Sequence, residues 1–97
     1  MQKEGKFRVV IPKPVEKDFV RLQKRTIERI CKGLQRLADD PFPKRGKAIK
    51  KLHMEKPTYR RLRIGDYRVI YRIQGQNVIL LAIVSRKDLE EELKKLK

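Results

Sequence analysis

The 97-residue sequence predicts a small α+β domain, with an N-terminal helical hairpin packed on one face of a mainly antiparallel four- to five-stranded sheet and a short C-terminal helix. Three observations predict this fold class. Residues 14–38 repeat apolar side chains at helical spacing. Residues 59–71, YRRLRIGDYRVIY, alternate in hydropathy on both sides of a Gly-Asp turn. Residues 78–84, VILLAIV, are apolar throughout, which is typical of an interior strand.

The N-terminal part predicts one strand and two helices. Residues 7–12, FRVVIP, alternate and are expected to start the sheet. Pro14 suits the first turn of a helix that continues to about Lys24. Thr26 is expected to cap a second helix, which ends at the Asp-Asp-Pro sequence beginning at residue 39. Two such amphipathic helices form a hairpin that can cover a sheet face.

The C-terminal part predicts a four-strand meander and a last helix. The lysine-rich segment 47–53 is expected to be an edge strand. The hairpin 59–71 follows, and a turn at residues 74–77 leads to the interior strand 78–84. The last helix runs from Asp88 to Leu96, with acidic residues early and lysines late, as the helix dipole favours. The whole chain, residues 1–97, is expected to form one domain with one modest core.

The hairpin 59–71 has two faces with different chemistry. A turn at Gly65-Asp66 places Ile64 opposite Tyr67 and Arg63 opposite Arg68. Side-chain alternation then assigns Leu62, Ile64, Tyr67, Val69, Tyr71 and Ile73 to a core face, and Tyr59, Arg61, Arg63, Arg68, Ile70 and Arg72 to a cationic face. Like charges opposed across strands destabilise a sheet, and arginine suits bidentate phosphate binding. The cationic face therefore predicts a polyanionic or acidic partner, with an ordinary solvated sheet face as the alternative.

The charge balance supports a polyanionic partner. The sequence has 27 Lys and Arg against 12 Asp and Glu, a formal net charge of +15. Residues 44–72 hold eleven of the basic residues and two acids. Nucleic acid, an acidic protein and an anionic membrane are the possible partners. A membrane is the weakest of these, because no apolar run approaches the ~18 residues of a span and the N-terminus lacks a signal-peptide apolar region, so a cytoplasmic location is expected.

Known catalytic and cofactor motifs are absent from the sequence. It contains no P-loop, GxGxxG, Ser-His-Asp set, CxxC or apolar pair of carboxylates. His53 is the single histidine, so neither a metal site nor a cofactor is expected. Cys31 is the single cysteine, which excludes an internal disulfide, and its helix position predicts a small core residue.

Four segments give the chain a family resemblance: FRVVIPKPVEKDFVRL at 7–22, ERICKGLQRLADDPF at 28–42, YRRLRIGDYRVIYRI at 59–73 and VILLAIVSRKD at 78–88. With these segments the sequence resembles the RelE/ParE superfamily of toxins from type II toxin-antitoxin systems, and in particular its RelE branch. The resemblance implies a helical hairpin on a sheet and a cognate RelB-like antitoxin. For the RelE branch it also implies cleavage of mRNA in the ribosomal A site.

The resemblance also implies site residues. Basic residues of RelE-like toxins on the first hairpin strand, in the GDYR phrase and after the final strand correspond to Arg61, Arg63, Arg68 and Arg86. Ser85 stands where many relatives have histidine or lysine, and no tyrosine follows Tyr71, so the general base stays open between Tyr59, His53 and no protein group. The further expected RNA-binding residues are Lys47, Lys50, Lys51, His53 and Arg72, and the expected antitoxin-binding residues are Leu89, Leu93 and Leu96.

Three functional hypotheses follow from these observations. The first is a ribosome-dependent mRNA endoribonuclease toxin, in which arginines hold the RNA backbone and stabilise charge as a 2′-hydroxyl attacks the adjacent phosphate. The second is a ParE-like inhibitor of DNA gyrase that performs no chemistry. The third is a non-catalytic nucleic-acid-binding relative.

Overall fold

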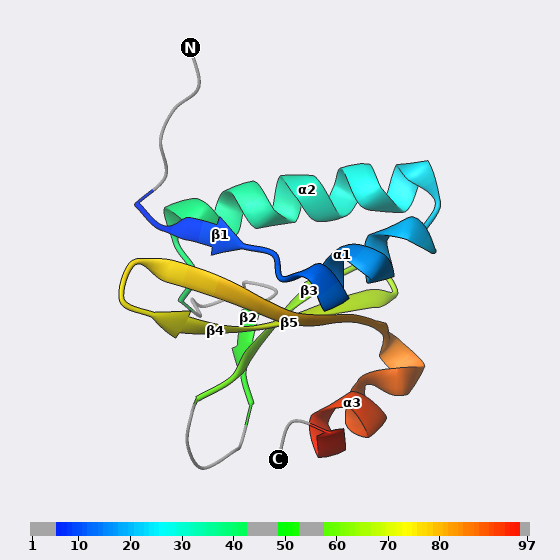
Figure 1. Ribbon diagram of the computed structural model, residues 1–97. Helices are drawn as coiled ribbons and strands as arrows, with labels where there is room; N and C mark the ends of the chain where they lie inside the picture. Colours follow the sequence, from blue (N-terminus) through cyan, green and yellow to red (C-terminus); the bar gives the residue numbers. More distant parts are fainter. Residues whose placement is uncertain (1–5, 43–48, 53–57, 96–97) are drawn as a thin grey trace.

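The computed structural model describes residues 6–42, 49–52 and 58–95 (Figure 1). Its elements in chain order are β1 (Arg8–Val10), α1 (Lys13–Val20), α2 (Lys24–Asp39), β2 (Ile49–Lys51), β3 (Arg60–Ile64), β4 (Tyr67–Gln74), β5 (Asn77–Ser85), a 3-10 helix (Arg86–Asp88) and α3 (Leu89–Lys95).

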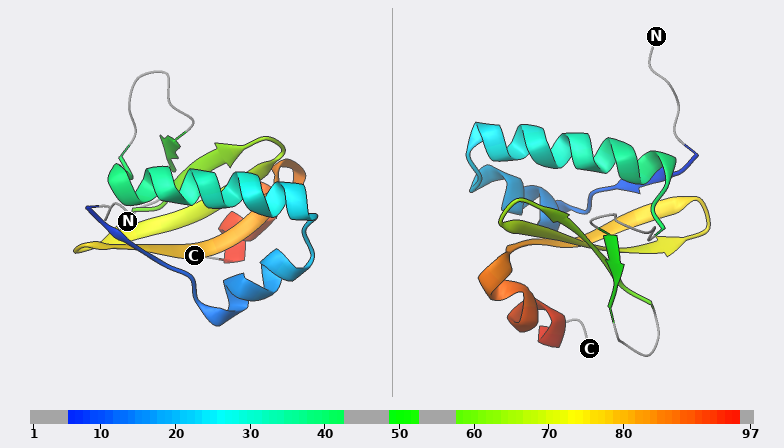
Figure 2. Two further views of the ribbon diagram at one scale, coloured as in Figure 1. Left: turned by 90° about the horizontal axis from the view of Figure 1, so that it is seen from above. Right: turned by 180° about the vertical axis from the view of Figure 1, so that it is seen from behind.

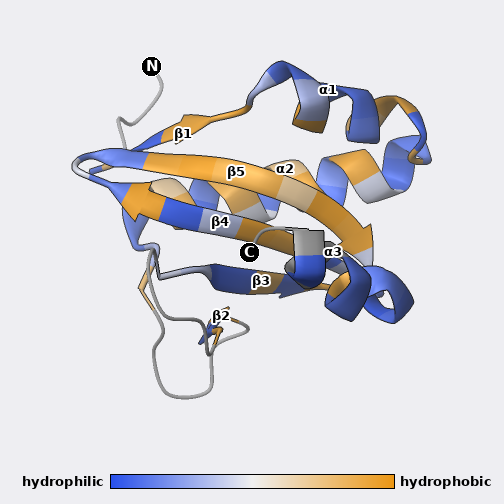
Figure 3. Ribbon diagram, turned by 60° about the horizontal axis from the view of Figure 1, so that its bottom comes forward, coloured by the Kyte–Doolittle hydropathy of each residue, from blue (hydrophilic) through white to orange (hydrophobic). Residues whose placement is uncertain are grey.

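The five strands form one sheet in the order β1-β5-β4-β3-β2. Strands β2 to β5 pair antiparallel with their sequence neighbours, while β1 pairs parallel with β5. The predicted meander is therefore confirmed. Strand β5 lies between β1 and β4, which confirms the interior strand, and β2 lies at the end of the strand order, as expected for an edge strand. In Figure 3, β5 is apolar along most of its length and β3 is mostly hydrophilic.

The helices divide between the two sides of the sheet. Helices α1 and α2 lie together over one face, as predicted, and α3 lies on the opposite side (Figures 1 and 2). The main core fills the space between the helical hairpin and the sheet. Its buried residues are Val15, Ile30, Leu34, Leu37, Leu62, Val69, Tyr71, Val78, Leu80 and Ile83. Within the described residues, no helix is both long and apolar enough to cross a membrane.

The start of α2 differs from the prediction. Thr26 was expected to be the N-cap, but the helix begins at Lys24, and Gln23 has the extended backbone of a capping position. The amide of Ile27 donates to the carbonyl of Gln23 at 3.0 Å. Residues 21–23 are the whole connection between α1 and α2, so α2 begins directly after this short turn.

The prediction that Cys31 is a core residue is wrong. Its side chain is exposed, beside an apolar groove between α2 and β1. The neighbouring Ile30 has no exposed surface and lies at the centre of the buried stripe of α2. Successive helix residues are separated by about 100°, so Cys31 falls at the margin of that stripe.

Two local features set the register of strands β3, β4 and β5. Gly65 has φ +57°, the left-handed backbone that a two-residue turn with a glycine first requires, and Ile64 pairs with Tyr67 as predicted. Between β4 and β5, Tyr71 pairs with Leu80 and Ile70 pairs with Ala82, so Leu81 is an extra residue on β5. This bulge was not predicted.

The hydroxyl of Tyr71 joins the sheet to the end of α2. It donates to the carbonyl of Pro41 at 2.6 Å, and Tyr71 has no exposed surface. We expect Tyr71→Phe to lower the free energy of unfolding by about 1–2 kcal/mol, because a buried carbonyl loses its donor. Urea denaturation at neutral pH measures this loss. Tyr67→Phe is the matched control, because Tyr67 is half-buried and its hydroxyl forms no hydrogen bond with the described residues.

The same contact has a pH signature. Burial raises the pKa of Tyr71 well above its usual value. The unfolded chain therefore loses this proton near pH ~10 while the folded chain keeps it, so stability falls as pH rises above about 10. Tyr71→Phe should flatten that fall. An equal alkaline loss in the wild type and in Tyr71→Phe would contradict this assignment.

Candidate nucleic-acid interface

Strands β2, β3 and β4 carry a row of basic side chains on the sheet face opposite α1 and α2. Arg63 pairs with Arg68, and Arg61 pairs with Ile70. Residues paired directly across antiparallel strands project to the same face. On β2, Lys50 pairs with Arg61 and extends the row. We call this surface the cationic face; its basic members are Lys50, Arg61, Arg63, Arg68 and Arg72.

Arg86 joins the cationic face at the turn of the hairpin. Its backbone amide donates to the carbonyl of Asp66 at 2.7 Å, which fixes the end of β5 against the turn. Burial, and then the charges of Arg86 and Arg63, lower the pKa of Arg68, while Asp66 opposes this shift. Burial, and then Arg68 and Arg63, also lower the pKa of Arg61. The charges of these arginines therefore act on one another, which favours an anion at this end of the sheet.

Arg68 is the buried member of the group. It is 8% exposed, and its Nη1 donates to the carbonyls of Gly65 at 2.9 Å and of Tyr67 at 3.0 Å. The side chain thus folds over the turn that it follows. The predicted face is correct. Alternation shows the direction of a side chain and not its hydrogen bonds, so the contacts of Arg68 with the turn were not predicted. Arg63, in contrast, is exposed.

Part of the cationic face is apolar and covered. Ile70 has no exposed surface, and its partner Ala82 is 5% exposed. Helix α3 lies on this side of the sheet (Figure 2) and contacts β5. Tyr59, expected on the open cationic face, is 8% exposed. Its expected accessibility is therefore contradicted, and its role as a base stays a prediction.

The structure places only some of the expected RNA-binding residues on the cationic face. Lys50 is exposed and Arg72 is half-buried on the cationic face. Lys51 is exposed but belongs to the other face, because it pairs with Arg60, whose partner on β4 is the core residue Tyr71. Lys47 and His53 lie outside the described residues.

The expected antitoxin-binding leucines are on the last helix. Leu89 begins α3 and is half-buried. The side chain of Leu93 and the whole of Leu96 lie outside the described part of the chain. The structure places α3 on the same side of the sheet as the cationic face (Figure 2).

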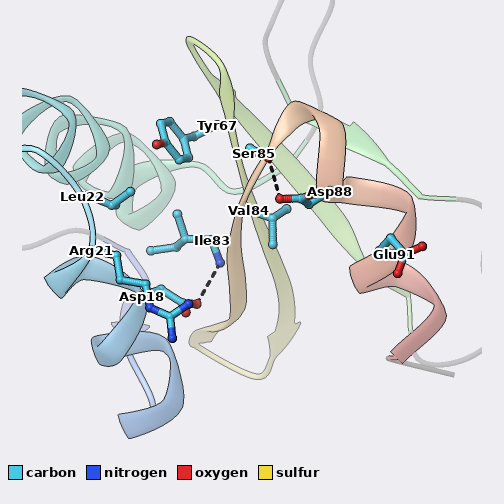
Figure 4. A pocket seen from close by; sticks show the side chains of 9 residues that line it. All are labelled: Asp18, Arg21, Leu22, Tyr67, Ile83, Val84, Ser85, Asp88 and Glu91. Carbon is cyan, nitrogen blue, oxygen red and sulfur yellow. Dashed lines mark hydrogen bonds between the residues drawn. The ribbon is translucent and has the colours of Figure 1, made fainter.

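A pocket of about 580 Å³ lies between the end of α1, the end of β5 and α3 (Figure 4). Asp18, Asp88 and Glu91 line it together with Arg21. Oδ2 of Asp18 accepts the amide of Ile83 at 3.4 Å. Three carboxylates disfavour a phosphate ligand, so this pocket does not extend the nucleic-acid interface. In the described residues, no three His, Cys, Asp or Glu side chains form a group that could hold a metal ion.

Sequence analysis missed a second group of basic residues. Arg29, Lys32 and Arg36 of α2 are exposed and line a depression with Arg63 of β3. Their spacing of three and then four residues was readable as one helical stripe. Along the chain this stripe is less conspicuous than residues 44–72, which have the highest density of basic residues.

Comparison with a family model gives a match over most of the chain. The family described as "ParE toxin of type II toxin-antitoxin system, parDE" matches residues 9–90. Among curated proteins, none matches the sequence significantly.

Comparison with solved structures gives similar folds. The archaeal RelE-RelB complex from Pyrococcus horikoshii OT3 contains a chain with 30% identity and a TM-score of 0.72, over 84% of this chain and 96% of that one. The RelB-RelE antitoxin-toxin complex from Methanococcus jannaschii gives 21% identity and a TM-score of 0.68, over 84% and 95%. The YoeB dimer from Staphylococcus aureus gives 15% identity and a TM-score of 0.66, over 80% and 94%, and indicates the shared fold alone.

Proposed function

The chain belongs to the RelE/ParE superfamily as a toxin of a type II toxin-antitoxin system, and from this premise we propose that it inhibits translation by cleaving mRNA in the ribosomal A site. The observation that carries the proposal is the convergence of Arg63, Arg68 and Arg86 at the turn end of the cationic face, with Arg61 two residues before Arg63 on the same face of β3. Such a group of donors is suited to a phosphodiester, whose charge increases at the transition state.

The proposed reaction needs few groups from the protein. The 2′-oxygen of a ribose attacks the adjacent phosphorus and loses its proton, the bond from phosphorus to the 5′-oxygen breaks, and that oxygen gains a proton. Arginine stays protonated throughout and donates hydrogen bonds to the non-bridging oxygens. Arg63 is exposed and can contact the phosphate directly. Arg68 is buried, donates to the turn at Gly65, and contributes its charge to the site without direct contact. The ribosome would present the strand in the geometry that attack requires.

The proton acceptor stays a prediction between three possibilities. Tyr59 is largely buried, which disfavours direct contact with a ribose. His53 lies outside the described residues. Solvent or the ribosome is the third possibility, with the arginines orienting the substrate. Tyr71 is unsuited to the role, because burial raises its pKa and its hydroxyl donates to Pro41.

We also propose a cognate antitoxin as a partner, since two of the similar structures are toxin-antitoxin complexes. A surface as basic as the cationic face favours an acidic segment. Because α3 lies on the same side of the sheet, one antitoxin segment could neutralise the arginines and compete with α3 (Figure 2). Together these contacts would block access of RNA.

A second candidate function is favoured by one specific observation. The matching family model carries the name of ParE toxins, so inhibition of DNA gyrase is the alternative. Induced expression separates the two candidates. Arrest of protein synthesis, with mRNA cut at A-site codons of purified programmed ribosomes, supports the proposal. DNA damage with intact mRNA supports the alternative and contradicts the proposal.

A further inference from the structure

A basic groove lies between α2 and the turn end of β3. It has a volume of about 340 Å³ and is lined by Arg29, Lys32, Arg36, Arg63, Ile64 and Gly65. We call it the α2 groove. Its size is within the range of small-ligand pockets, but four of its six described lining residues are cationic, so it does not suit an apolar ligand.

The close approach of α2 to the hairpin forms the floor of this groove. Gly33 faces Ile64 so closely that a Cβ at residue 33 would lie 2.7 Å from the Cδ1 of Ile64. On the turn, a Cβ at Gly65 would lie 3.4 Å from Nη1 of Arg29. The helix therefore packs on β3 through a residue without a side chain, and the basic residues on either side of it form the wall. Arg29 and Arg36 are about 10 Å apart along the helix axis, at a rise of ~1.5 Å per residue.

The groove and the cationic face share one residue, Arg63. Within the described residues, β2 pairs with β3 at Arg60 to Leu62 and not at Arg63 or Ile64. Arg63 is exposed. It shares a face with Arg68 across the hairpin and also lines the α2 groove. A chain of phosphates that contacts Arg63 is therefore in reach of both surfaces.

The four cations of the groove are unpaired within the described part of the chain. Arg29, Lys32, Arg36 and Arg63 are exposed, and none forms an ion pair with another described residue. No carboxylate is among the described residues that line the groove. Like charges gathered in one depression repel one another, and an external polyanion relieves that repulsion while releasing its own counter-ions.

We propose that the α2 groove is a second binding site for the phosphodiester backbone of RNA, linked to the cationic face through Arg63, which belongs to both surfaces. The inference rests on the proposed function and adds an RNA contact remote from the reacting phosphate. An RNA strand held at two places would be fixed in register on the cationic face, because phosphate contacts position a nucleic acid without reading its bases.

Equilibrium binding of a fluorescently labelled single-stranded RNA oligonucleotide tests this site. We compare Arg29→Ala/Arg36→Ala with Arg8→Ala/Lys13→Ala, which removes the same charge from exposed residues near the far edge of the sheet. The groove variant should bind RNA roughly 10-fold more weakly than the control variant. Its slope of log K against log salt should be smaller by about 1.4, since each phosphate contact on a single strand contributes about 0.7. Arg29→Lys/Arg36→Lys should restore most of the slope.

The outcomes separate this inference from the proposed function. Equal affinity and equal salt slope in the groove and control variants would overturn the α2 groove as an RNA site, even if the wild type cleaves mRNA on ribosomes. A specific loss in the groove variant supports the site, even if the wild type cleaves nothing. Thermal unfolding should be the same for both variants, because the substituted side chains are exposed.

Discussion

Arg63→Ala is expected to reduce single-turnover cleavage of mRNA on programmed ribosomes by roughly 10²-fold or more, as does loss of other preorganised donors. Arg63 is exposed on the cationic face, opposite Arg68, and is free to donate to a phosphate. The fold should be unaffected. Removing one of two opposed like charges should leave the free energy of unfolding unchanged or raise it by a few tenths of a kcal/mol.

Two variants sharpen this test. Arg8→Ala removes an equally exposed arginine from β1, at the other end of the strand order, and should retain the wild-type rate. Arg63→Lys keeps the charge but loses the planar donor pair, so an intermediate rate is expected. Wild-type cleavage by Arg63→Ala would refute the role of this residue. Loss of about 1 kcal/mol or more of stability would instead show that Arg63 supports the fold.

Arg68→Ala should lower both the cleavage rate and the stability. The residue is 8% exposed as a whole, and its partly buried guanidinium donates to the carbonyls of Gly65 and Tyr67. Hydrogen bonds from a charged donor are each worth about 1.5–3 kcal/mol. Both bonds come from one nitrogen and are only partly buried, which lowers their contribution, and relief of repulsion from Arg86 and Arg63 offsets a further part, so we expect a net destabilisation of about 1–2 kcal/mol. Urea denaturation measures this term, and the cleavage rate is corrected for the folded fraction.

Comparison with Arg63→Ala separates a structural role of Arg68 from a contribution of its charge to cleavage. If the rate of Arg68→Ala returns to the wild-type value after correction, Arg68 acts by holding the turn. If a large loss remains, its charge also contributes at the phosphate. Arg68→Met, which keeps the apolar bulk of the side chain, should reproduce the loss of stability because both carbonyls lose their donor. Unchanged stability in both variants would contradict the hydrogen bonds to the turn.

The local rules of strands and turns were sufficient for the hairpin. A glycine-first turn between alternating segments determines which residues are opposed, and the observed pairs Ile64 with Tyr67 and Arg63 with Arg68 follow from it. The same rules placed Arg61 and Arg72 on the cationic face. Strand β5 was predictable because an interior strand is covered on both faces and needs no polar alternation.

The same rules did not predict where α2 begins or which side chains are exposed. Thr26 is a good capping residue, but the N-cap of α2 is Gln23, three residues earlier. Cys31 lies one residue from the fully buried Ile30 and is nevertheless exposed. The segment around Lys51 alternates imperfectly, so its pattern did not indicate to which face the side chain belongs. Pairing with Arg60 places Lys51 away from the cationic face.

The sequence by itself determined the order of the elements, the register of the hairpin and the face to which each of its side chains belongs, because these depend on residues close together in the chain. Tertiary structure alone decided which members of the cationic face are accessible. Tyr59 and Ile70 are buried, Arg68 folds onto the turn, and α2 places Arg29 beside Gly65. Such contacts join residues far apart in the chain or depend on rotamers, and no local periodicity encodes them.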